Sequence, residues 1–346
     1  MIKNKIVLIF GCGSIGAHHA NASRRLGYEV LITDINKKQF IFFKNKLYPG
    51  RYKQWDKKIK FINYEEVYKL QINFNLIIVG TSPINHIPVL LECYKKLNFD
   101  KILVEKPLCI YSQDHKVLKK ILNDKRVYCG FNHTLSESVN FIFKTLKRKQ
   151  LGKIKSVKII WKEDFKNVMK AHPWVKSLSN SYLSNLEAGG GGLHEYSHAA
   201  HLLMNIKEIL FRKSQINIDS KIVFKKIKKT HYDHISNLTF KIKECLFELK
   251  INTLANPDIK EILLVGDNGS LLWSRIMSNA TEKVKLCIDN KLIAKNFKVA
   301  RPDDFINQIK VLETFRTKHE YLYMNNLKNS LKTINFIKQG FVNNNV

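Results

Sequence analysis

The sequence predicts an α/β protein that begins with a doubly wound parallel sheet and continues into an α+β domain with an open-faced, mainly antiparallel sheet. Three observations predict this architecture. Short apolar runs alternate with helical stretches over the first 130 residues, as they do in parallel α/β sheets. A glycine-rich turn directly follows the first apolar run. From Leu151 onward, strand-like runs follow one another with short turns between them, which is typical of an antiparallel sheet.

The length of 346 residues predicts two domains, which we place at residues 1–130 and 131–346. Hydrophobic residues make up 45% of the chain, enough for two sizeable cores. No apolar run is long enough to cross a membrane. The apolar run near the N-terminus is short and ends in the glycine turn, so we expect a first strand there and not a signal peptide.

The formal charge of +30 raises the alternative of a nucleic-acid-binding protein. Only nine of the 59 basic residues are arginines, and the lysines are spread along the whole chain. Nucleic-acid binders tend to cluster their charge and to use arginine at base edges. We therefore expect a generally basic surface that attracts anionic substrates such as sugar nucleotides, and no nucleic-acid partner.

The six cysteines indicate a reducing compartment. No two of them form a C-x-x-C pair, and a chain of this length does not need disulfides for its stability. We expect a cytoplasmic protein.

The first strand, turn and helix have the pattern of a dinucleotide-binding unit. Residues 5–10 form a buried strand, and the motif Gly11-Cys-Gly13-Ser-Ile-Gly16 follows directly. A helix is expected over residues 15–26 and a second strand over 29–33. A lone GxGxxG is a weak signal, but this one lies between a strand and a helix, as the Rossmann fold requires.

Each part of this unit has a mechanical role in the prediction. Gly11 permits the tight turn, Gly13 lets the backbone approach a diphosphate, and Gly16 allows close packing of helix on strand. The N–H groups at the helix start, around Ser14 and Ile15, attract phosphate. Asp34 ends the second strand, where a carboxylate binds ribose hydroxyls and repels a 2′-phosphate. We therefore expect NAD, with NADP as the alternative because two lysines follow Asp34.

The alternation continues with strands at 75–80, 101–105 and 126–129 and helices after residue 83 and near 111–123. Ligands of such sheets bind beyond the carboxyl ends of the strands. The residues found at these ends, which we expect to contact the cofactor, are Thr81, Ser82, Pro83 and Lys106.

In the second domain, strands are expected at residues 155–161, 221–227, 235–241, 245–252, 261–265, 270–274, 284–288 and 292–297. A loop and a helix occupy about residues 165–205, and amphipathic helix begins near 303.

The stretch GGGGLHEYSH contains His194-Glu195-x-x-His198, the spacing of a zinc peptidase helix. Four preceding glycines each cost up to about 1 kcal/mol inside a helix, so they suit a tight loop that opens one. His201 would be the third ligand that zinc needs. A dinucleotide domain has no use in peptidase chemistry, so we interpret the motif as a coincidence and expect no metal. We expect structural roles for His194, His201 and, on the first helix, His18 and His19.

Several motifs, in order, resemble the Gfo/Idh/MocA oxidoreductases, the family of glucose–fructose oxidoreductase and inositol dehydrogenase. They are the GxGxxG turn, "GTSPINH" at 80–86, Glu105-Lys106-Pro107, Gly130-Phe-Asn132 and "DNGSLLW" at 267–273. The resemblance covers nearly the whole chain. It implies a Rossmann domain in which Thr81–Pro83, His86, Glu105 and Asn132 contact the cofactor. It also implies a second α+β domain and a homodimer or homotetramer.

A sugar-related branch of this family has a similar arrangement around its histidine. This chain has His172-Pro-Trp174, Ser181-Tyr182 and the glycine run before Glu195 and His198. The resemblance implies that His198 is the general acid/base, Lys106 stabilises charge on the reacting oxygen, and Glu195 orients the substrate or the histidine. Trp174 and Tyr182 are expected to contact the substrate together with Lys106 and His198. Ala199 and His201 depart from the acidic residues usual in this branch.

The leading hypothesis is an NAD-dependent oxidoreductase that transfers a hydride between nicotinamide and a hydroxyl or keto carbon of a sugar or sugar nucleotide, in bacterial surface glycan synthesis. The alternative within the same fold is a non-catalytic NAD-binding sensor or structural protein.

Overall fold

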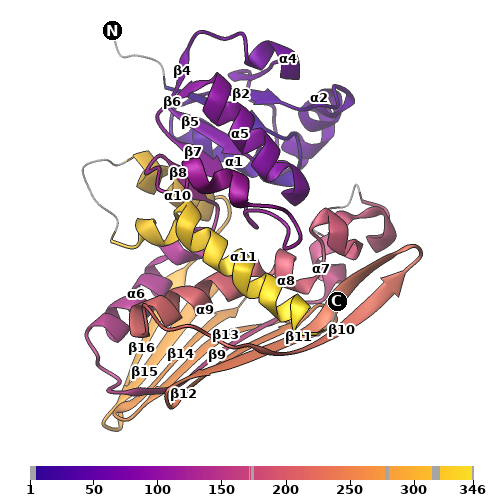
Figure 1. Ribbon diagram of the computed structural model, residues 1–346. Helices are drawn as coiled ribbons and strands as arrows, with labels where there is room; N and C mark the ends of the chain where they lie inside the picture. Colours follow the sequence, from indigo (N-terminus) through magenta and orange to yellow (C-terminus); the bar gives the residue numbers. More distant parts are fainter. Residues whose placement is uncertain (1–4, 171, 173–174, 277–279, 314–319, 345–346) are drawn as a thin grey trace. The chain divides into compact units, whose positions relative to one another are not determined.

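The computed structural model describes residues 5–344 except 171, 173–174, 277–279 and 314–319. The chain divides into two compact units, each built from separate stretches of sequence (Figure 1). The first unit comprises Met1–Cys109, Gln113–Asn132 and Arg301–Lys328. The second comprises Ile110–Ser112, His133–Ala300 and Asn329–Val346. No helix in the described part of the chain is long and apolar enough to cross a membrane.

A six-stranded parallel sheet forms the centre of the first unit, in the order β3-β2-β1-β5-β7-β8. The bounds are β1 (Ile6–Phe10), β2 (Glu29–Thr33), β3 (Ile59–Phe61), β5 (Leu76–Val79), β7 (Ile102–Val104) and β8 (Val127–Cys129). The strands are apolar almost without interruption because both faces of the sheet are covered. The strand order reverses between β1 and β5, which makes their carboxyl ends the place where a ligand binds in such folds.

The helices of this unit are α1 (Ser14–Arg25), α2 (Lys38–Phe42), α3 (Tyr48–Tyr52), α4 (Tyr64–Val67), α5 (His86–Lys96) and α10 (Asp303–Glu313). A π-helical turn, Phe43–Leu47, joins α2 to α3. The two-residue strands β4 (Asn73–Phe74) and β6 (Asn98–Phe99) pair beside the main sheet. Helix α10 packs on α1, so a segment from the far end of the sequence completes this unit.

The prediction of a helix near residues 111–123 is wrong. This segment contains turns and a 3₁₀ helix, Lys116–Lys120. Its buried apolar residues are Leu118 and Ile121, three positions apart. Two buried apolar residues are fewer than the three to four per two turns that an amphipathic α-helix buries, and the pair fits the three-residue turn of a 3₁₀ helix.

The second unit is built on an eight-stranded sheet in the order β10-β11-β12-β9-β13-β14-β15-β16. The bounds are β9 (Ile154–Lys162), β10 (Asp219–Ile227), β11 (Thr230–Ile242), β12 (Cys245–Asn252), β13 (Ile259–Gly266), β14 (Gly269–Ile276), β15 (Thr281–Ile288) and β16 (Lys291–Lys298). All pairs are antiparallel except β12 with β9. The expected α/β class, with a parallel sheet followed by a mainly antiparallel one, is confirmed.

Helices α6 (Glu137–Lys147), α9 (Ser197–Leu210) and α11 (Leu327–Val342) lie over one face of this sheet (Figure 1). Phe336 of α11 meets Phe240 of β11 edge-on, and Trp161 and Trp273 stack within the sheet with ring centres 6.2 Å apart. The connection from β9 to α9 contains α7 (Phe165–Lys170), short 3₁₀ turns and α8 (Gly192–Glu195). All six cysteines are free thiols, and only Cys287 is not buried.

Candidate active site

The turn after β1 packs tightly against neighbouring backbone on one side, and its other side faces open space. Gly11 has a φ of +108°, and a Cβ there would lie 2.5 Å from the carbonyl oxygen of Gly80. A Cβ on Gly16 would lie 2.1 Å from the carbonyl oxygen of Gly11. In contrast, a Cβ on Gly13 would meet nothing within 4 Å. The backbone at Gly13 therefore faces open space at the start of α1, where a diphosphate would lie.

Asp34 is fixed against this turn. One carboxylate oxygen accepts a hydrogen bond from the Cys12 N–H at 2.9 Å, and the other accepts one from the Asn36 N–H at 2.9 Å. The negative charge therefore lies at the glycine turn. It favours ribose hydroxyls as partners and opposes a 2′-phosphate.

Two predicted cofactor residues serve to hold the strand ends in place. His86 is buried, with Nδ1 2.7 Å from the Pro107 carbonyl oxygen and Nε2 3.0 Å from the Thr81 carbonyl oxygen. Burial lowers the pKa of His86 despite these contacts, so the ring is neutral and donates one hydrogen bond at a time. His86 thus connects the segment after β5 with the segment after β7.

Glu105 is also buried. It accepts hydrogen bonds from His19 Nε2 at 2.7 Å and from the Lys106 N–H at 3.1 Å. Burial raises the pKa of Glu105, but the hydrogen bonds and the charges of His19 and Lys106 outweigh it, so the net pKa is lowered. A Cβ on Gly130 would lie 2.8 Å from this carboxylate, so glycine is needed there. Lys106 follows at the carboxyl end of β7 with a partly exposed side chain.

Polar atoms that are buried at this edge of the sheet without a hydrogen-bond partner among the described residues include Thr33 Oγ1, Thr81 Oγ1 and Asn132 Oδ1. Buried polar groups are normally satisfied, so such atoms indicate a place for a ligand. Asn132 donates from Nδ2 to Asp304 Oδ2 at 3.2 Å. Ser82 Oγ accepts a hydrogen bond from Asn85 at 2.9 Å, and Pro83 opens the turn before α5. Together with Gly13 and Asp34, these residues fit a bound NAD.

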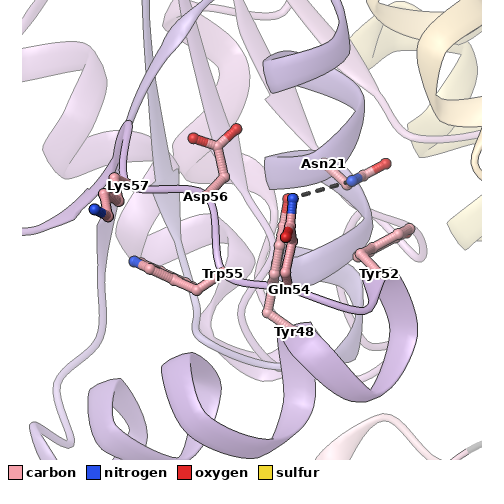
Figure 2. A pocket seen from close by; sticks show the side chains of 7 residues that line it. All are labelled: Asn21, Tyr48, Tyr52, Gln54, Trp55, Asp56 and Lys57. Atoms are coloured by element: carbon pink, nitrogen blue, oxygen red, sulfur yellow. Dashed lines mark hydrogen bonds between the residues drawn. The ribbon is translucent and has the colours of Figure 1, made fainter.

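A surface cavity of about 500 Å³ in the same unit is a different feature (Figure 2). It is lined by Asn21, Tyr48, Tyr52, Gln54, Trp55, Asp56 and Lys57. None of these residues belongs to the glycine turn or to the carboxyl ends of β5 and β7. The predicted cofactor residues therefore do not lie in this cavity.

In the second unit, the glycine run forms the loop that the sequence predicts. Gly189 and Gly191 both have φ of +87°, which favours glycine. Asp233 of β11 is fully buried under the loop and accepts hydrogen bonds from the Leu193 N–H at 2.9 Å and Ser236 Oγ at 2.8 Å. A Cβ on Gly191 would lie 2.0 Å from this carboxylate. Burial raises the pKa of Asp233 to about 7, against the effect of its hydrogen bonds.

The HExxH string does not lie on one helix. Helix α8 ends at Glu195, Tyr196 breaks the helical path with φ −95° and ψ 27°, and α9 starts at Ser197. Glu195 and His198 therefore lie on two different helices, α8 and α9. His194 Nδ1 lies 3.0 Å from the Gly190 carbonyl oxygen, and Nε2 accepts the Tyr111 N–H at 3.1 Å.

Both ring nitrogens of His194 thus have backbone partners, which leaves neither for zinc. His201 is buried against Thr333 Oγ1 at 2.8 Å, so the structural roles expected for these two histidines are confirmed. Within the described residues, no group of three histidine, cysteine or acidic side chains could hold a metal ion.

His198 is partly exposed near the start of α9, and its ring lies edge-on to that of His133, 4.6 Å between centres. Glu195 accepts a hydrogen bond from the Tyr182 hydroxyl at 2.9 Å, so these two predicted residues lie together. Trp174 lies outside the described residues. The catalytic and substrate roles of these residues stay predictions.

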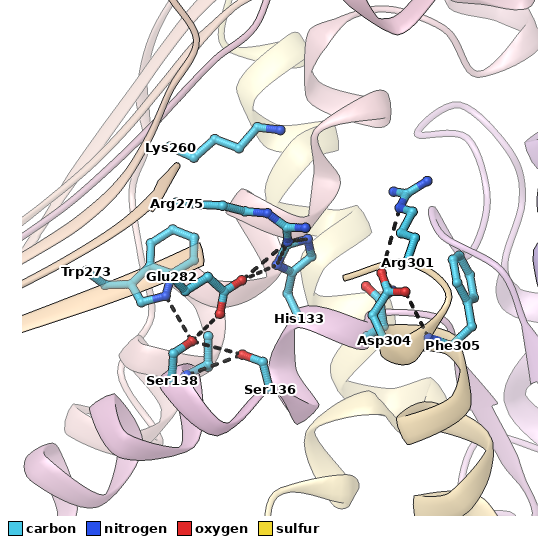
Figure 3. A network of polar contacts seen from close by, with 12 residues as sticks. His133, Ser136, Ser138, Lys260, Trp273, Arg275, Glu282, Arg301, Asp304 and Phe305 are labelled. Atoms are coloured by element: carbon cyan, nitrogen blue, oxygen red, sulfur yellow. Dashed lines mark hydrogen bonds and ion pairs between the residues drawn. The ribbon is translucent and has the colours of Figure 1, made fainter. Parts of the chain in front are cut away.

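Sequence reasoning missed a buried network beside His198 (Figure 3). Arg275 Nη1 lies 3.3 Å from Glu282 Oε1 and 3.4 Å from His133 Nε2. The other oxygen of Glu282 accepts a hydrogen bond from Ser138, whose hydroxyl also accepts the Trp273 indole N–H at 3.0 Å. In the sequence, the position of His133 directly after Asn132 is a signal that could have indicated this network. This network fixes the orientation of the ring that packs against His198.

A comparison with protein families matches the N-terminal part of the chain. Residues 5–133 match the family model of the Gfo/Idh/MocA oxidoreductases, an oxidoreductase family with an NAD-binding Rossmann fold. This match confirms the expected family resemblance and the NAD cofactor. No curated protein sequence matches the chain.

Solved structures of low identity share the whole fold. Aldose-aldose oxidoreductase from Caulobacter crescentus is 12% identical with a TM-score of 0.74, and the alignment covers 99% of this chain and 98% of that one. The inositol dehydrogenase homolog from Azotobacter vinelandii is 13% identical with a TM-score of 0.71, over 100% and 96%. The WlbA dehydrogenase from Bordetella pertussis is 13% identical with a TM-score of 0.67, over 99% and 97%.

The raised pKa of Asp233 predicts how stability depends on pH. The folded protein holds this proton more tightly than the unfolded chain, so the stabilisation is complete below about pH 4 and is lost as pH rises towards 7. Between these values the unfolding free energy should fall relative to Asp233→Asn by about 4 kcal/mol. Denaturant titrations at several pH values measure this difference. Asp219→Asn, at an exposed position on β10, is the control, and parallel pH curves for the unsubstituted protein and Asp233→Asn would contradict the prediction.

The open side of the glycine turn predicts opposite effects for two alanine substitutions. Gly13→Ala should fold with an unchanged thermal midpoint but bind NAD at least about tenfold more weakly, because the new methyl group occupies the space of the diphosphate. Gly11→Ala should destabilise the fold by about 1–3 kcal/mol, because a positive φ and a backbone clash oppose it. Calorimetric NAD titration and thermal unfolding separate the two effects. Undiminished NAD affinity in Gly13→Ala would show that the ligand does not lie there.

Proposed function

With residues 5–133 forming the NAD-binding domain of a Gfo/Idh/MocA oxidoreductase, we propose that the chain oxidises or reduces one carbon of a sugar or sugar nucleotide. The observation that carries this proposal is the open backbone at Gly13 beside the Asp34 carboxylate. It accommodates a diphosphate and a free ribose at the same turn. Bound NAD supplies the hydride chemistry, and the side chains of this protein position the substrate and move its proton.

In the proposed mechanism, Lys106 and His198 act on the same substrate oxygen. Oxidation of a secondary alcohol requires removal of the hydroxyl proton, and His198 accepts it. An imidazole suits this role in both directions because its ordinary pKa lies near 6.5. The Lys106 ammonium donates a hydrogen bond to the oxygen as negative charge develops there. Glu195, held by the Tyr182 hydroxyl, orients hydroxyl groups of the substrate.

The substrate class is supported by chemistry and by the named structural neighbours. Those neighbours include an aldose-aldose oxidoreductase, an inositol dehydrogenase homolog and a dehydrogenase crystallised with NADH and UDP-GlcNAcA. The net charge of +30 favours an anionic substrate, so within this class we propose a sugar nucleotide, used in bacterial surface glycan synthesis.

The residues that motivated a non-catalytic alternative lie in the protein interior. Ala199 has no exposed surface, and His201 is buried against Thr333. Their departure from the family pattern therefore removes no acidic group from an exposed site and does not favour a sensor role.

We further propose that the protein is cytoplasmic and forms a homodimer or homotetramer through its eight-stranded sheet. The edge strand β16 supports this assembly, because Leu292 and Ile293 are 64% and 48% exposed. Sedimentation of the full chain tests the oligomeric state.

Replacing Lys106 tests the electrostatic role. Lys106→Met should reduce kcat by about 10²- to 10³-fold, as loss of one donor to a developing oxyanion does, and leave NAD affinity nearly unchanged. The measurement is NADH absorbance with a panel of aldoses, inositols and UDP-sugars, followed by calorimetric NAD titration. Lys125→Met, at an exposed lysine before β8, is the matched control. A Lys106→Met protein with full activity would refute the mechanism.

Replacing His198 tests the proton transfer. His198→Asn should lower kcat/KM by about 10²- to 10⁴-fold and flatten the limb of the pH–rate profile that reports the general base. His231→Asn, at an exposed histidine of β11, should leave both unchanged. If His198→Asn retains the pH profile of the unsubstituted protein, another group carries the proton.

A further inference from the structure

Arg51 brings a guanidinium to the start of α1. It lies in α3, and its Nη2 donates a hydrogen bond to Ser14 Oγ at 2.8 Å. Ser14 is the first residue of α1 and follows Gly13, whose outer side is open. The GxGxxG motif gives no indication of this residue, because Arg51 comes from the segment between β2 and β3.

His18 fixes the orientation of this guanidinium. Its Nδ1 lies 2.6 Å from the Tyr52 hydroxyl oxygen, and its Nε2 contacts Arg51 Nη1. A neutral imidazole satisfies both contacts when Nδ1–H donates to Tyr52 and Nε2 accepts from Arg51. The His18 ring also stacks on Phe305, with ring centres 5.1 Å apart and an angle of 8°. The Arg51 side chain is therefore held in place from two directions, by Ser14 and by His18.

The first N–H groups of a helix have no partner within the helix, and the start of α1 also carries the positive end of the helix dipole. A dinucleotide diphosphate is an anion with several acceptor oxygens, and a planar guanidinium binds such groups through paired N–H donors. A guanidinium within hydrogen-bond distance of Ser14 Oγ lies within reach of a phosphate bound at this turn.

We propose that Arg51 binds the diphosphate of NAD together with Ser14 and the N-terminus of α1, and that His18 and Tyr52 position it. The first unit then attracts the cofactor by a side-chain charge as well as by its backbone. This inference concerns cofactor binding alone and does not depend on the identity of the substrate.

Calorimetric titrations of the full chain with NAD, ADP-ribose and adenosine test the proposal. Arg51→Gln should weaken NAD and ADP-ribose by about 10- to 100-fold, the effect of losing a charge-assisted hydrogen bond, and should leave adenosine affinity unchanged. Arg51→Lys keeps the positive charge but lacks the paired N–H donors of a guanidinium. It should weaken the binding of the two diphosphate ligands by an intermediate factor. If a thermal unfolding control shows that Arg51→Gln does not fold, the affinities of Arg51→Lys test the proposal.

Arg24→Gln is the matched control. It removes the same charge from the same unit, ten residues further along α1, where Arg24 pairs with Asp56. At about 1.5 Å per residue this is about 15 Å from Ser14, so all three affinities should be unchanged. Diphosphate affinity that is the same in Arg51→Gln, Arg51→Lys and the unsubstituted protein would overturn the proposal. Equal losses for adenosine and ADP-ribose would also overturn it, because the effect would then not depend on phosphate.

Discussion

The buried carboxylate of Glu105 is the interaction on which the geometry of the first unit depends. It ends β7, binds His19 of α1, accepts the Lys106 N–H and fills the space that Gly130 leaves at the end of β8. A charge with this little exposure is costly unless it is paired and hydrogen-bonded, and removal of one partner leaves the other unsatisfied. The interaction of Glu105 with His19 therefore fixes helix α1 relative to the ends of β7 and β8. The glycine turn and Lys106 take their positions from that arrangement.

The two units hold their loops in place by different means. In the first unit, backbone geometry determines the shape of the glycine turn. Gly11 and Gly16 permit close backbone contacts that a Cβ would prevent, and Gly13 leaves the outer side of the turn open. In the second, buried charges support the functional segment. Asp233 holds the loop before His198, and the Arg275–Glu282 pair holds the ring of His133.

Sequence reasoning succeeded where local pattern and tertiary environment agree. The strand before Gly11 requires buried apolar residues, and the turn over Gly11–Gly16 requires glycines. Both requirements give patterns that can be recognised in the sequence. Glu105 was placed at the end of the strand over 101–105 and His86 in the helix after the strand over 75–80. Their burial and partners could not be inferred, because His19 and Pro107 are distant in sequence. Arg51 and Arg275 were missed for the same reason. Their rarity in a lysine-rich chain was the only available signal, since arginine serves where paired donors are needed.

The HExxH string shows why a short motif needs its surroundings. Zinc binding would require His194 and His198 on consecutive turns of one helix with free ring nitrogens. Here the preceding glycines let the backbone pass over Asp233, and that close packing brings the ring of His194 into the core against Gly190 and Tyr111. The chain then turns at Tyr196 before α9 starts, which leaves His198 partly exposed near the beginning of a new helix. The same four glycines that open this loop therefore keep the two histidines of the string on separate helices, so the string cannot form a zinc site.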